Sequence, residues 1–145
     1  MHQIHDMDLI DNSRLVSNYL DLVEQQQDLD FDELVKQKII NLYRIFKDND
    51  LDVLVKAIDQ NTVLEELILK NNNLSLNEGI LTGEIARNTT IKVLDLSGNG
   101  ISLQGMKNLA TAIKKNKTLT HVYIHNIIYT KDEYDGLRML ADALT

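Results

Sequence analysis

A single motif, L-x-x-L-x-L-x-x-N, recurs in this chain at a nearly fixed spacing. It occurs as LEELILKNN from Leu64 to Asn72 and, with Ile in first place, as IKVLDLSGN from Ile91 to Asn99, 27 residues later. An altered third copy, LTHVYIHNI, begins at Leu119, after a further 28 residues. A repeat of this length indicates a solenoid, in which each unit buries its apolar face against its neighbours.

Each unit joins a strand, whose apolar residues alternate, to a helix, whose apolar residues recur every three or four positions. Helices are predicted over Leu51–Ile58, about 78–86 and Leu103–Ile113, and the pattern resumes in the final GLRMLADAL. The strand residues expected to point inward are Leu64, Leu67, Leu69, Ile91, Leu94, Leu96, Leu119, Val122 and Ile124. The third copy is followed by a longer loop, which is typical of a terminal repeat.

The segment VLDLSGNGISLQGMKNLATAIKKNKTL, from Val93 to Leu119, resembles the ribonuclease-inhibitor class of leucine-rich repeats. The resemblance covers roughly residues 50–144. It implies an α/β solenoid with short parallel strands on the concave face and α-helices on the convex face. The class includes ribonuclease inhibitor, the Ran GTPase-activating protein and the tropomodulins, and no motif in this chain allows a catalytic residue to be carried over from them.

Residues 1–50 contain no clear repeat and are predicted to form a helical N-terminal cap. Residues 51–145 are predicted to hold the repeats and a C-terminal capping helix, in one continuous domain with the N-terminal cap. Apolar residues between Ile10 and Val23 suggest one amphipathic helix, and those between Leu34 and Phe46 suggest a second. In the alternative interpretation, IINLYRIF supplies a short irregular strand beside Leu64–Lys70.

Composition narrows the choice of partners and location. The net charge is −7, and residues 1–50 hold 11 acidic and 5 basic side chains against 11 and 10 in residues 51–145. Nucleic acid is not expected as a partner, because phosphate binding needs clustered Lys and Arg. The chain has no Cys, no apolar run long enough for a membrane span and no signal-peptide pattern at its start. A cytoplasmic protein is predicted, or one in a host cytosol if it is a delivered effector.

Repeated Asn residues are predicted to have structural roles. Asn72 and Asn99 follow the strands, where a buried amide can bond backbone groups of adjacent turns. Asn61, Asn88 and Asn116 follow the helices, where Asn tolerates the left-handed conformation of a cap. A structural role is also preferred over glycosylation for the Asn residues that begin N-x-S/T sequences, namely Asn73, Asn88 and Asn116.

A candidate binding surface follows from the strand alternation, because residues between the inward leucines face the concave side. Stacking the three copies gives three columns: Glu66, Val93 and His121; Ile68, Asp95 and Tyr123; and Lys70, Ser97 and His125. Tyr123 is predicted to anchor a protein partner, because aromatic side chains dominate interface energies. The alternative is a solvated sheet face without a binding role.

No catalytic, cofactor or metal site is predicted. His121 and His125 are four residues apart in a strand, roughly 13 Å, which is too far to share one ion. The cluster His2, His5, Asp6 and Asp8 lies in a terminus that makes a weak chelator, and the loop with Asp132, Glu133 and Asp135 lacks EF-hand spacing. LSGNG lacks the Lys of a P-loop.

The predicted function is therefore a non-catalytic protein-interaction module that uses the concave strands or adjacent loops. The alternative is an enzyme regulator, either an inhibitor or, as the resemblance implies, a GTPase activator of the Ran-directed type.

Overall fold

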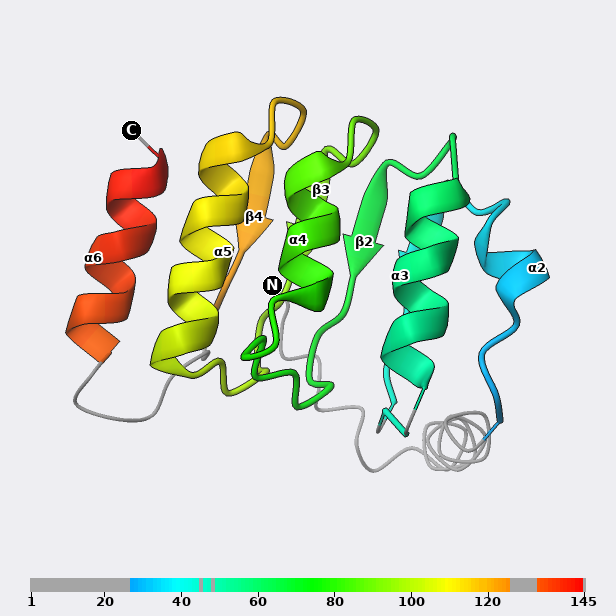
Figure 1. Cartoon of the computed structure of the whole chain (residues 1–145), viewed down its shortest axis with the longest axis horizontal. Coiled ribbons are helices and arrows are strands. Elements are labelled where there is room, and N and C mark those ends of the chain that lie inside the picture. The colour runs from blue at the N-terminus through cyan, green and yellow to red at the C-terminus, as the bar shows by residue number, and fades with distance from the viewer. Residues whose placement is uncertain (1–26, 45, 48, 126–132, 145) are drawn as a thin grey trace, which may run out of the picture.

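The computed structural model describes residues 27–44, 46–47, 49–125 and 133–144 of the chain. Its parallel sheet has the strand order β1-β2-β3-β4, and helices α3–α6 form a second layer along one face (Figure 1). The predicted α/β solenoid of alternating strands and helices is confirmed. The strands are β1 (Ile39–Asn41), β2 (Glu66–Ile68), β3 (Val93–Asp95) and β4 (His121–Tyr123). The helices are α2 (Phe31–Leu34), α3 (Asp50–Gln60), α4 (Ile80–Arg87), α5 (Leu103–Lys115) and α6 (Glu133–Leu144).

Adjacent strands pair at the period of the sequence repeat. Leu67 of β2 pairs with Leu94 of β3, which in turn pairs with Val122 of β4. Leu67 and Leu94 are completely buried, whereas the residues on either side of each are partly exposed. The alternation of apolar and polar residues therefore selects the strand face that packs against the helices, and this pins the register.

The four predicted helices are present, each within a few residues of its expected ends. Leu54, Leu81 and Leu109 occupy equivalent positions in α3, α4 and α5, and none is more than 2% exposed. Together with the inward strand residues they form one core along the whole solenoid. The helices thus cover the apolar side of the sheet, and the opposite side is left free of them (Figure 1).

The expectation of a second amphipathic helix between Leu34 and Phe46 is wrong. Residues 39–41 form β1 instead, which pairs in parallel with β2, so the alternative interpretation of this segment is confirmed. The buried Arg44 fixes the chain just after β1, because its Nη2 lies 3.1 Å from an Asp50 carboxylate oxygen and its backbone N–H donates to Asn72 Oδ1. The first predicted helix, between Ile10 and Val23, lies outside the described residues.

Asn72 and Asn99 bond the backbone of neighbouring turns, as predicted. The Asn99 amide nitrogen donates to the carbonyls of Leu69 and Leu96, each at 2.8 Å. Its Oδ1 accepts from the backbone N–H groups of Asn72 at 2.8 Å and Leu74 at 3.1 Å. With a longer bond of 3.4 Å to Ser97 O, this one buried side chain bonds five backbone groups at the point where the strand layer turns toward the helices.

The left-handed conformation expected at Asn61, Asn88 and Asn116 is wrong, since their φ angles are −79°, −66° and −72°. Each residue has extended backbone and works through its side chain. Asn116 Oδ1 accepts from the N–H groups of Thr118 and Leu119, and its Nδ2 donates to Ile85 O at 2.7 Å. Asn61 and Asn116 thus join the end of one helix to the end of the helix before it, whereas Asn88 Oδ1 accepts from the nearby N–H groups of Thr90 and Ile91.

Candidate functional site

The candidate site is the open face, defined as the side of the sheet away from helices α3–α6. Strand pairing aligns Glu66 with Val93 and Val93 with His121, which makes the first predicted column. It also aligns Ile68 with Asp95 and Asp95 with Tyr123, which makes the second.

The third column lies just beyond the strand ends. His125 donates its backbone N–H to Ser97 Oγ at 3.1 Å, so these two residues are neighbours. Lys70 is exposed, and the adjacent Asn71 donates its N–H to Ser97 O at 2.9 Å. The predicted residues are therefore adjacent on one face.

β1 adds a fourth row that the sequence columns did not contain. Ile39 pairs with Glu66 and Asn41 pairs with Ile68, and Tyr43 follows two residues later. Ile39 is 48% exposed and Tyr43 is 58% exposed, so both present apolar surface on this side. The sequence contains a weak sign of this strand, because Ile40 and Leu42 stand 27 residues before Leu67 and Leu69. The first Leu and the final Asn of the motif are replaced in this row.

Aromatic side chains stand at both ends of the open face. Tyr43 belongs to the β1 row, where it lines a hollow of about 370 Å³ together with Ile68, Lys70 and Asp95. Tyr123 stands on β4, is 43% exposed and stacks on His121 with ring centroids 6.3 Å apart. The surface between the two tyrosines combines apolar area with charges of both signs, as protein interfaces commonly do.

A line of charges borders this face where the strands begin. Lys38 Nζ lies 3.0 Å from one Glu65 carboxylate oxygen, and Lys92 Nζ lies 3.1 Å from the other. The hydrogen bond from Lys38, and then that from Lys92, lowers the pKa of the Glu65 carboxyl below its ordinary value. Glu65 is therefore held in its charged form between two cations from neighbouring repeats.

Within the described ranges, no three His, Asp or Glu side chains gather in a way that could hold a metal ion, and no helix is long and apolar enough to cross a membrane. The terminal cluster His2, His5, Asp6 and Asp8 lies outside the described residues, as does Asp132 with most of the Ile127–Asp135 loop.

Comparisons with known proteins agree with this architecture. A family model described as Leucine Rich repeat matches residues 87–110, which include β3 and the first part of α5. A solved structure of Leiomodin-1 Actin-Binding Site 2 (ABS2) aligns with a TM-score of 0.62 and 23% identity, over 78% of this chain and 73% of that one. No curated protein matches the chain. The fold is a leucine-rich-repeat fold, and the narrower ribonuclease-inhibitor class stays a prediction.

Proposed function

We propose that this domain is a non-catalytic protein-interaction module, which binds a protein partner through the open face of its sheet. The observation that carries the proposal is the pair of exposed tyrosines, Tyr43 and Tyr123, at opposite ends of a face that none of the helices α3–α6 covers. Tyrosine supplies large contact area with little loss of side-chain freedom, so it is a common anchor in interfaces.

The surface between the tyrosines supports the same proposal. Ile39, Ile68 and Val93 contribute apolar area at its centre and edge, and each is partly exposed. Lys70 and Asp95 add opposite charges beside the hollow next to Tyr43. A partner with an apolar centre and polar edges fits such a pattern, because desolvated apolar anchors supply affinity and the charges around them supply specificity.

A defined first partner to test is actin, because the similar leiomodin-1 structure is that of an actin-binding site. At 23% identity that likeness concerns the fold, so actin is a probe for this chain. Co-sedimentation with filaments and gel filtration with monomers test the two forms of actin. If the partner proves to be an enzyme whose turnover changes on binding, the module is a regulator, as in the alternative prediction.

The proposal is tested by removing the two anchors. In Tyr43→Ala and Tyr123→Ala variants, affinity for a partner captured by the intact chain is expected to fall at least about tenfold, since an interface anchor typically contributes more than about 1.4 kcal/mol. Leu137→Ala is a suitable control, because Leu137 is 42% exposed but lies on α6, away from the open face.

Thermal unfolding of all three variants separates loss of binding from loss of fold. If both tyrosine variants fold normally and bind as tightly as the Leu137→Ala control, the open face is not the binding site.

A further inference from the structure

The repeat that begins at Leu64 has a shorter helix than the repeats on either side of it. α4 has 8 residues and α5 has 13, although both end at equivalent positions, Arg87 and Lys115. The residues that would form the first turn of α4 instead belong to a loop, residues 74–79. α4 begins after Gly79, which has a φ of 73° and provides no side-chain cap.

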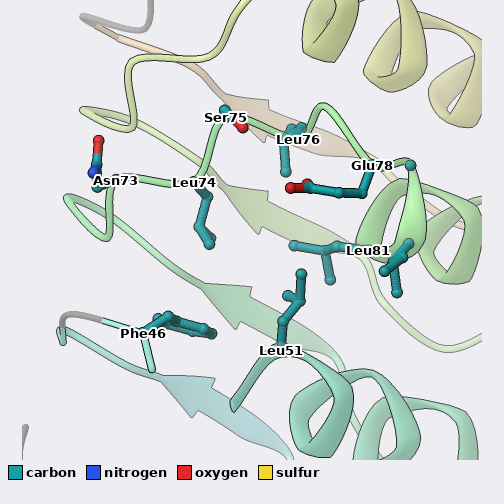
Figure 2. Close-up of a pocket in the computed structure, with 10 residues that line it drawn as sticks. Phe46, Leu51, Asn73, Leu74, Ser75, Leu76, Glu78 and Leu81 are labelled. Atoms are coloured by element: carbon teal, nitrogen blue, oxygen red, sulfur yellow. The ribbon is translucent and has the colours of Figure 1, made fainter. Parts of the chain in front are cut away.

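A pocket of about 130 Å³ lies between this loop and α3. Figure 2 shows Phe46 and Leu51 on one side of the pocket, with Leu74, Leu76 and Leu81 across from them. The walls are mainly apolar side chains, and Phe46 and Leu51 remain partly exposed although they touch the core. We name this space the α3–α4 pocket; none of its lining residues belongs to the open face.

Contacts with α5 hold the loop in place on the side away from α3. Asn108 Nδ2 donates to Leu76 O at 2.7 Å, and the Ser102 hydroxyl bonds the Asn77 side-chain oxygen. Leu76 is kept buried with a φ of 63°, a left-handed conformation that Leu rarely adopts. Because these bonds tie the loop to α5, the pocket is formed in advance of any ligand, and its apolar walls are already in place.

One charged side chain lines the pocket. Figure 2 shows Glu78 extending from the loop toward the space bounded by Leu74 and Leu81. Among the described residues, no Lys, Arg or His lies within ion-pair distance of the Glu78 carboxylate. The pocket therefore combines mainly apolar walls with one exposed carboxylate, which has no ion-pair partner in the part of the chain that the structure describes.

We propose that the α3–α4 pocket is a second binding site, which takes the side chain of a lysine from a protein partner. The aliphatic part of lysine suits the leucine and phenylalanine walls, while its ammonium group meets Glu78 at the rim, as lysine side chains do when they cross an apolar surface. The size agrees, because a cavity of roughly 150 Å³ holds one benzene ring, which is comparable in bulk to a lysine side chain.

The test uses the full chain and a short blocked peptide, acetyl-Gly-Ala-Lys-Ala-Gly-amide, in an NMR titration of backbone amides. Shifts are expected at Leu76, Gly79 and Ile80. The same peptide with norleucine in place of lysine is expected to bind about two- to fivefold more weakly, which is the usual contribution of a partly exposed ion pair. In Glu78→Gln this preference for lysine disappears.

Asp59→Asn is the matched control, because Asp59 is an exposed acid on α3 that does not line the pocket. The preference for lysine is expected to persist in this variant. Equal binding of the two peptides, or an unchanged preference in Glu78→Gln, overturns the assignment of lysine. If n-pentylammonium shifts the pocket amides and the lysine peptide does not, the site binds small amines and the proposed protein ligand is wrong.

Discussion

Replacing Asn99 by Ala removes the side chain that makes the most hydrogen bonds to the backbone in the part of the chain that the structure describes. Asn99 is 1% exposed, and its side chain makes four hydrogen bonds of 3.1 Å or less to backbone groups and a longer one, of 3.4 Å, to Ser97 O. Alanine is small enough to fit, so the change removes hydrogen bonds without overpacking the core. The backbone groups of Leu69, Asn72, Leu74 and Leu96 would then need water or new partners in a buried turn.

The structure sets the size of the effect. Four bonds at about 1 kcal/mol each give a loss of about 4 kcal/mol in the free energy of unfolding. For a chain of this length, that corresponds to a fall of about 8–16 °C in Tm. Asn72→Ala removes only two such bonds, to Leu42 O and from Arg44 N, so its loss is expected to be about half as large.

Urea unfolding followed by circular dichroism measures both values. Asn41→Ala is the control, since Asn41 is an exposed strand residue with no side-chain hydrogen bond in the described part of the chain. It should change stability by less than about 0.5 kcal/mol. If Asn99→Ala destabilises the protein no more than this control, the backbone groups are satisfied in other ways and the reasoning is refuted.

Two further changes have defined outcomes. Glu65 has a pKa lowered by Lys38 and Lys92, so its charged form stabilises the fold above its ordinary pKa of 4.5, and this contribution is lost as pH falls through the lower folded value. Stability measured from pH 7 to 3 should therefore fall less steeply in Glu65→Gln; an identical slope would show that the ion pairs are not responsible. In Gly105→Ala the added Cβ would lie 1.9 Å from Ser75 O, so the helix or loop must shift. A loss of at least about 1–3 kcal/mol is expected in thermal unfolding, and full stability would contradict this packing.

The sequence predicts most of this fold because its patterns are local and repeated. Leu67 and Leu94 recur at a fixed distance, and stacking equal units leaves only one way to bury them together. The same regularity places Ile68, Asp95 and Tyr123 side by side. The repeat pattern does not predict the structure of a unit that departs from it. β1 lacks both the first Leu and the final Asn of the motif, so its row of exposed residues is not predicted with the others.

The α3–α4 pocket depends on a different kind of departure. The spacing of the repeats does not predict whether residues 74–79 join α4 or form a loop; they form a loop, and α4 begins at Ile80. That choice depends on contacts with α5, through Ser102 and Asn108, which form only once the neighbouring repeat is packed. The pocket thus depends on the packing of the repeat that holds α4 against the repeat that holds α5.

The asparagine bonds between repeats have a direction. Asn61 donates to Leu34 O and Gln37 O, Asn99 donates to Leu69 O, and Asn116 donates to Ile85 O. In each case the later repeat completes the backbone of the earlier one. Removing a C-terminal repeat therefore leaves backbone carbonyls of the preceding repeat without their hydrogen-bond donors. Removing an N-terminal repeat takes away mainly the carbonyls that accept these bonds. During synthesis, the turns of each repeat therefore gain these side-chain hydrogen bonds only after the next repeat has been made.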